Sequence, residues 1–280
     1  MKAAPTYIFE GGLFSLISHT ASILVRFYLP LWLIAMVFAF PTFLLSDLID
    51  ALENESLAFV SLAIFVIAVY FASFVIVGEV SEICLGGTAS LSKALIRTSI
   101  KGVVRLLGTD ILVWLCIGFV VVLGAVALAM LNALLKGHKI MLFITPVVFT
   151  LLFVVTLAAF LFTAQVVVIE RMYWFSALKR SFFLVLSSKG RAFVVALVLI
   201  MITLVSWALI FSVPYSDQML HGNLPVIRET LPRNILVSFL YTIYLPIPNT
   251  FLTLAYYYLR RTSETLSISE LADIKAYESG

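Results

Sequence analysis

The residues of this sequence best suited to chemistry are cations spaced four apart. They are Lys93, Arg97, Lys101 and Arg105. Residues at this spacing share one face of an α-helix, so the stripe predicts a helix whose cationic face meets anionic lipid headgroups or an anionic solute. Each basic residue near a negative leaflet would contribute about 1 kcal/mol. The alternative is that these cations only orient the chain in a membrane.

A second basic stretch, ERMYWFSALKRSFFLVLSSKGR, covers residues 170–191. Read as a helix, its apolar face consists of Phe175, Leu178, Phe182, Val185 and Leu186. Lys179 and Arg180 fall largely on the opposite face, which is the pattern of a helix that lies flat on a membrane surface. We expect Lys179, Arg180 and Arg191 to join the first stripe in contacting membrane lipids or another membrane or cytoplasmic protein.

Other kinds of chemistry have few candidates. His138 and His221 have no carboxylate or cysteine at ligand spacing beside them, so no metal site is predicted. The sequence contains no GxSxG, HExxH or P-loop motif. A net charge of +3 is too small to indicate nucleic-acid binding. We therefore expect a protein that is not an enzyme and that binds no cofactor, metal or nucleic acid.

The elements that must position these residues are membrane helices. The chain is 62% hydrophobic and only 12% charged, whereas about 25% of a soluble domain is charged. Six apolar runs are each long enough to cross a hydrocarbon core of about 30 Å, and in lipid such runs must be helical. They cover residues 23–46, 57–78, 106–135, 140–169, 192–213 and 235–259. The predicted fold class is all-α and polytopic, with six transmembrane helices plus two or three interfacial amphipathic helices.

The distribution of charge predicts an orientation and a repeat. Fourteen of the 18 Lys and Arg residues fall on the side that carries both termini, which predicts that both termini are cytoplasmic and that the protein lies in the cell (inner) membrane. Similar segments begin near Leu13, Leu95 and Leu178, and two apolar runs follow each. This predicts repeats 8–86, 87–169 and 170–262 in one integral membrane domain, 1–262, followed by a cytoplasmic tail, 263–280.

The last apolar run contains the sequence LPIPN at residues 245–249. Pro246 and Pro248 each remove a backbone donor, which predicts a kink or break and frees carbonyls near Thr242 and Tyr244. One interpretation is a hinge that lines a solute site, as in many transporters, and it predicts a transporter or permease subunit. The other is a fixed kink that helps the bundle pack.

Polar groups inside the apolar runs bear on the same choice. Ionisable side chains are nearly absent there, which argues against a proton- or ion-coupled carrier. Gln165 is the deepest strongly polar residue, and we expect it to form a hydrogen bond with a neighbouring helix.

Three short motifs mark the C-terminal half of the chain. An acidic residue, Glu170, closes an apolar run. An A-L-x-R-S helix follows, and the last run ends in T-L-x-Y-Y-x-L-R. Their residues are Ala177, Leu178, Arg180 and Ser181, then Thr253, Leu254, Tyr256, Tyr257, Leu259 and Arg260.

These motifs resemble the membrane domain found ahead of some glycerophosphoryl diester phosphodiesterases, and its free-standing inner-membrane relatives of unknown function. The resemblance covers about residues 160–262 and implies a six-helix fold. It does not imply hydrolysis, because the phosphodiesterase chemistry belongs to a separate soluble domain. In the family an Asp often stands between the second Tyr and the Leu, where this chain has Tyr258, so any role of that carboxylate is lost or moved here.

Overall fold

The computed structural model describes residues 12–50, 55–85, 100–134, 141–188, 190–211 and 227–264, and it is helical throughout its regular elements. Five helices are long and apolar enough to cross a membrane, or six if a bent helix pair counts as one span. The helices are α1 (Leu13–Asp50), α2 (Glu55–Cys84), α4 (Ile100–Leu134), α5 (Met141–Ala159), α6 (Thr163–Ile169), α7 (Phe175–Ser187), α8 (Arg191–Phe211), α9 (Ile227–Tyr244) and α10 (Pro246–Glu264). The predicted all-helical fold class is therefore confirmed for the described residues, whose long apolar helices are compatible with a multi-pass membrane protein.

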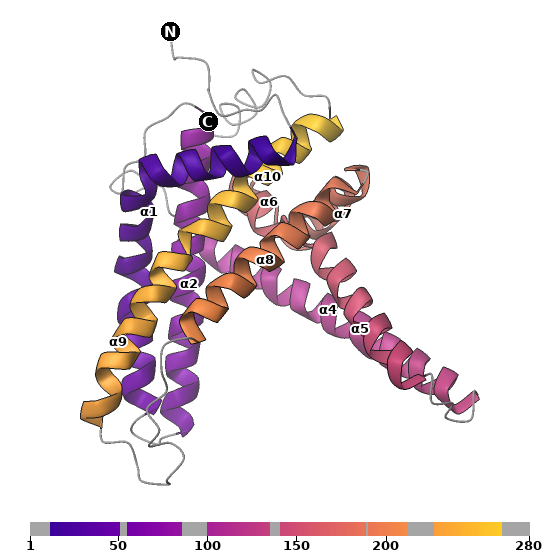
Figure 1. Cartoon of the computed structure of the whole chain (residues 1–280), viewed down its shortest axis with the longest axis horizontal. Helices are drawn as coiled ribbons and strands as arrows, with labels where there is room; N and C mark the ends of the chain where they lie inside the picture. The colour runs from indigo at the N-terminus through magenta and orange to yellow at the C-terminus, as the bar shows by residue number, and fades with distance from the viewer. Residues whose placement is uncertain are drawn as a thin grey trace.

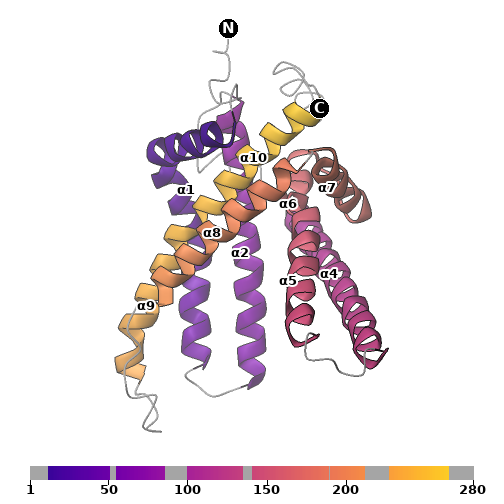
Figure 2. The same ribbon diagram turned by 45° about the vertical axis from the view of Figure 1, so that its right-hand side comes forward.

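The helices form a main bundle and a diverging arm. In the bundle, α1 and α2 run side by side with α9 and α10, and the first part of α1 lies across one end (Figure 1). The arm consists of α4 and α5, which lean away from the bundle in both views (Figure 2). A large apolar core fills the bundle, while a smaller cluster around Val113, Ile117 and Leu178 joins the arm to α7. The end of the bundle where α6, α7 and α10 meet carries the site described below.

Helices α2 and α10 pack in parallel in a fixed register. Asn249 donates to the Ser73 hydroxyl at 3.4 Å, and the hydroxyls of Ser81 and Tyr257 lie 2.6 Å apart. Both pairs have the same sequence separation, 176 residues, so each step along one helix matches an equal step along the other. Polar pairs of this kind hold helices together where lipid supplies no hydrophobic driving force.

The last candidate span, Ile235–Glu264, is interrupted at one residue next to the two prolines but is not sharply bent, and whether the prolines form a hinge or a fixed kink stays a prediction. Helix α9 ends at Tyr244 and α10 begins at Pro246, with Leu245 in a turn between them. Pro246 takes the first helical position, where a missing N–H costs nothing. Side chains satisfy carbonyls at the break: Tyr28 donates to Ile243 O at 2.8 Å, and Asn249 donates to Leu245 O at 2.9 Å.

The structure differs from the predicted elements at three places. The fourth run is interrupted at residues 160–162, between α5 and α6. Helix α4 continues without interruption from Ile100 into the third span, so Lys101 and Arg105 belong to that helix and not to a separate surface helix. Helix α10 extends to Glu264, past the predicted end of the domain at 262. The first part of the Lys93–Arg105 stripe and the tail after 264 lie outside the described residues, and the three-fold repeat stays a prediction.

Candidate functional site

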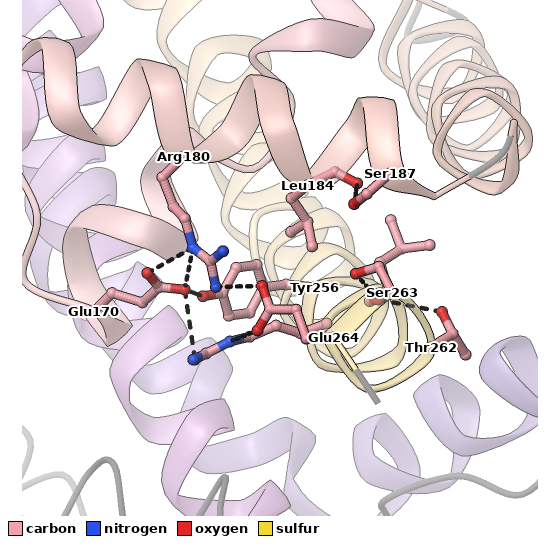
Figure 3. A network of polar contacts seen from close by, with 10 residues as sticks. Glu170, Arg180, Leu184, Ser187, Tyr256, Thr262, Ser263 and Glu264 are labelled. Atoms are coloured by element: carbon pink, nitrogen blue, oxygen red, sulfur yellow. Dashed lines mark hydrogen bonds and ion pairs between the residues drawn. The ribbon is translucent and has the colours of Figure 1, made fainter. Parts of the chain in front are cut away.

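A ring of alternating charges lies where α6, α7 and α10 meet. Arg180 Nε donates to both oxygens of Glu170, at 3.1 and 2.9 Å, and Arg180 Nη2 lies 2.5 Å from Glu264 Oε1. Arg260 closes the ring: its Nη1 lies 3.4 Å from Glu170 Oε1 and its Nε lies 3.1 Å from Glu264 Oε2. Figure 3 shows the side chains of Glu170, Arg180 and Glu264 pointing toward one another. Two arginines thus face two carboxylates, which leaves the ring without net charge.

The ring has a deep side and a shallow side. The side chains of Glu170 and Arg260 are only 5% and 7% exposed, while those of Arg180 and Glu264 are 25% and 23% exposed. On the deep side, the Tyr256 hydroxyl donates to Glu170, and the Tyr256 ring packs against Phe162. Buried polar groups need partners, and three donor groups, from Arg180, Arg260 and Tyr256, surround the Glu170 carboxylate.

Arg180 stays charged within this ring. It belongs to α7, outside the five spans. Burial acts against its charge, but the hydrogen bond and the charge of Glu170, and then the charge of Glu264, more than offset burial and raise the pKa of Arg180 above the ordinary guanidinium value. A guanidinium therefore bridges the two carboxylates at any physiological pH.

Two consecutive residues of α7 hold the short helix α6 at both of its ends. At the break before α6, the Ser181 hydroxyl donates to Ala159 O at 3.1 Å and accepts the Phe162 N–H at 3.3 Å. After α6, Arg180 holds Glu170, which is the C-cap residue of that helix. The hydroxyl satisfies backbone groups that a break inside lipid would otherwise leave without partners. The A-L-x-R-S motif therefore fixes the position of α7 against α6.

The connection from α6 to α7 has an unusual backbone and is held against α4. Arg171 and Trp174 have positive φ angles of 54° and 57°, a region that costs non-glycine residues about 1–3 kcal/mol. The Trp174 N–H donates to the Thr109 hydroxyl at 3.0 Å, and the Arg105 guanidinium lies over the Tyr173 ring, 4.2 Å from its centroid. A Cβ at Gly108 would lie 3.0 Å from the Trp174 ring, so glycine is what lets the indole approach α4.

Helix α7 presents two different faces. Its buried face consists of Ala177, Leu178, Ser181 and Leu184. The large apolar side chains of the other face are exposed, and they are Phe175, Phe182, Phe183 and Leu186. Lys179 lies on this exposed side, 5.9 Å from the centroid of the Phe183 ring. The helix therefore keeps an apolar face that no described residue covers.

A sharp turn joins α7 to α8, and the two helices meet at 106°. Gly190 has φ +86° in this turn, a conformation that glycine adopts without steric cost. The Ser188 hydroxyl accepts the Ala192 N–H at 3.2 Å and so caps the start of α8. If α8 runs along the membrane normal, α7 lies close to the membrane plane.

The structure separates the residues that the sequence grouped together. Lys101, Arg105, Lys179 and Arg191 are exposed, as a headgroup contact requires. Arg180, which was grouped with them, is instead bound by Glu170 and Glu264. Lys93 and Arg97 lie outside the described residues.

The residues of the C-terminal motifs come together in space. Glu170, Arg180, Tyr256 and Arg260 all belong to the charged ring or touch it. Ser181 closes the α5–α6 break, and Tyr257 binds Ser81 of α2.

Sequence reasoning missed several polar groups. Glu264 was assigned to the tail, although its spacing of four from Arg260 was a readable signal. Glu79 is buried within the candidate span Ala63–Cys84. The partner of Asp110 was also not predicted, and it is the Tyr70 hydroxyl of α2, which donates to the carboxylate. The expectation for Gln165 was wrong, because its amide is buried without a hydrogen-bond partner in the described part of the chain.

Metal binding finds no support in the described ranges, where no three His, Cys, Asp or Glu side chains gather in a way that could hold an ion. Cys84 and Cys116 form no disulfide within the described residues. The groups that the ring itself presents are paired charges and hydrogen-bond donors.

Comparison with protein-family models, with curated proteins and with solved structures found no match to this chain. The assignment of function therefore depends on the geometry of the chain itself.

Proposed function

We propose that this integral membrane protein binds anionic lipid headgroups through helix α7 and the exposed cations beside it. The observation that carries the proposal is the two-faced helix α7, which meets α8 at 106°. One face is fixed to the fold, and the other presents Phe182, Leu186 and Lys179 outward. The predicted separation of Lys179 from the aromatic face was wrong, because Lys179 shares the exposed side and Leu178 is on the buried one. A long lysine side chain on an apolar face can still reach the headgroups while the aromatic side chains lie at the acyl boundary.

The exposed cations supply the electrostatic part of the proposed binding. Two of them, Lys101 and Arg105, lie near the start of α4. Lys179 lies on α7, and Arg191 is the first residue of α8. At about 1 kcal/mol per basic residue near a negative leaflet, four of them contribute at most about 4 kcal/mol, and less for Arg105 because it also lies on the Tyr173 ring. By the positive-inside rule, this end of the bundle and both termini would face the cytoplasm.

The enrichment of anionic lipid bound to the protein tests this proposal. The triple variant Lys101→Gln/Lys179→Gln/Arg191→Gln removes three exposed cations, and Lys101→Arg/Lys179→Arg/Arg191→Lys is the charge-conserving control. Both would be reconstituted in mixed phosphatidylglycerol and phosphatidylcholine nanodiscs, and the bound lipid would be counted by mass spectrometry. We expect the Gln variant to lose its enrichment of phosphatidylglycerol and the control to keep it. Unchanged enrichment in a correctly oriented Gln variant would refute the proposal, and a lysate protein captured only by the wild type would indicate a protein partner instead.

We further propose kinship with the membrane domain associated with glycerophosphoryl diester phosphodiesterases. Its support is that the motif residues Glu170, Arg180 and Tyr256 meet in one cluster. Motif positions that stabilise one another are expected of a shared fold, and they imply no hydrolytic activity.

A transporter or permease subunit is the second candidate. The observation in its favour is the break at Leu245, because the buried hydroxyls of Ser238 and Thr250 on its two sides lack hydrogen-bond partners within the described residues. Broken helices with free polar groups form solute sites in many transporters. Flux through vesicles of the wild type and of Pro246→Ala/Pro248→Ala would be compared across a solute panel. If the wild type carries no solute, this candidate is eliminated.

A further inference from the structure

We propose that Arg180 and Arg260 form a phosphate-binding site that Glu264 occupies as an internal substitute, and that the phosphate of an anionic lipid headgroup displaces it. This inference rests on the proposed function, because it names the group that α7 would bring to a headgroup. It also assigns Arg180 a role that the exposed cations cannot fill.

The geometry of the two carboxylates carries the first step. Glu170 and Glu264 each bridge the same two guanidinium groups. Glu170 is almost completely buried and has Tyr256 as a further donor, while the Glu264 side chain is 23% exposed. Only Glu264 can therefore leave without opening the core. Its two oxygens take one nitrogen from each arginine, at 2.5 and 3.1 Å, as two oxygens of a phosphate would.

The local helix chemistry carries the second step. Glu264 follows Arg260 by four residues on α10, and a cation placed before an anion at this spacing is the weaker order of such a pair. This rule does not favour an acid at this position. The arginines therefore hold Glu264 in place, and residues that break local rules in this way are expected at functional sites.

Charge balance carries the third step. With Glu170 fixed inside, the ring holds two positive charges and one negative charge once Glu264 moves away. That net positive charge lies on Arg180 of α7, the helix whose exposed Phe182 and Leu186 point outward. A phosphate oxyanion restores neutrality, and both lipid phosphate and inorganic phosphate have the required oxygens.

The test measures phosphate binding by the full chain when Glu264 loses its charge. Phosphatidic acid would be titrated into phosphatidylcholine nanodiscs and bound lipid measured by native mass spectrometry. Inorganic phosphate would be titrated separately in neutral detergent. Glu264→Gln should bind phosphatidic acid on the order of fivefold more tightly than the wild type. The substitution removes the negative charge that competes with the phosphate for the two arginines, and one such charge changes the binding free energy by about 1 kcal/mol. Glu264→Asp keeps the charge and should bind like the wild type.

The double variant Glu264→Gln/Arg180→Gln should not show the tighter binding of phosphatidic acid that Glu264→Gln shows. A gain for phosphatidic acid alone would identify the source as a lipid headgroup, and an equal gain for inorganic phosphate would identify the phosphate itself as sufficient. If Glu264→Gln folds poorly, saturating phosphatidic acid should recover its lost stability. Affinity equal to that of the wild type, or a gain that survives loss of Arg180, overturns the inference.

The two proposals fail separately. If the Lys101/Lys179/Arg191 variant keeps its bound lipid while Glu264→Gln gains affinity, headgroup binding by the exposed cations is refuted and the site at Arg180 and Arg260 is supported. If that triple variant loses lipid and Glu264→Gln gains no affinity, headgroup binding by the exposed cations is supported and the two-arginine site is refuted.

Discussion

Replacing Glu170 with Gln tests the charged ring most sharply. The substitution preserves the shape of the side chain but removes a charge that receives three contacts from two arginines within 3.4 Å and a hydrogen bond from Tyr256. Two guanidinium groups would then share the single carboxylate of Glu264. Breaking a buried ion pair costs about 3–5 kcal/mol. Because a quarter of the Arg180 side chain is exposed, solvent screens part of the loss, and we expect about 3 kcal/mol.

The assay is reversible unfolding of the full chain in mixed micelles with increasing dodecyl sulfate, followed by far-UV circular dichroism. Arg180→Gln and the double variant Glu170→Gln/Arg180→Gln complete a mutant cycle. The double variant restores a neutral pair of Arg260 and Glu264, so its cost should be less than the sum of the single costs by about 1.5–3 kcal/mol. Tyr256→Phe, which removes one donor and no charge, is the mild control at about 1 kcal/mol. Additive costs, or a loss below about 1 kcal/mol for Glu170→Gln, would refute the view that these charges act as a unit.

Three further substitutions test contacts elsewhere in the fold. Ser181→Ala leaves the Ala159 carbonyl and the Phe162 amide without their partner, so it should cost about 1–3 kcal/mol and speed hydrogen exchange at Phe162; exchange equal to that of the wild type would contradict the proposed role. Tyr257→Phe removes the contact with Ser81 and should cost about 1 kcal/mol, and the same unfolding assay measures it against Tyr258→Phe, whose side chain is less buried. Tyr28→Phe takes the donor from Ile243 O at the proline break and should cost about 1–2 kcal/mol because a carbonyl in lipid finds no water; a fully stable variant would show that the carbonyl has another partner.

The long helices and the proline break were predictable because each follows from a local rule. Backbone groups in lipid have no partners outside the helix, so apolar length alone indicates a span. Pro246 and Pro248 lack the donors that a continuous helix needs. Such rules need no information about distant parts of the chain.

The break at residues 160–162 was not predictable, because no proline or glycine marks it. Its stabilising partner, Ser181, comes from a helix that begins after the break and turns back onto it. The pairing of Arg180 with Glu264 likewise joins residues far apart in the sequence. Helical periodicity placed Arg180 on a polar face but could not distinguish solvent from a buried carboxylate.

Buried acids were missed for a different reason. The apolar run 57–78 was ended just before Glu79, whereas α2 continues to Cys84 with Glu79 inside it. A hydropathy boundary stops at the first charge, but a helix continues if that charge is paired within the fold. Glu79 lies buried in such a continuous helix.

The depth of α7 in the bilayer is the most direct test of the proposed function. After substitution of the two native cysteines, Cys84 and Cys116, single cysteines would replace Phe175, Lys179, Phe182 and Leu186. The depth of spin labels on them would be measured by power-saturation electron paramagnetic resonance. These four positions share the exposed face of α7, so a helix lying on the surface predicts labels at the same shallow depth, just below the headgroups, at all four. A depth that increases steadily from 175 to 186 would contradict it, because α7 would then enter the bilayer as part of a span.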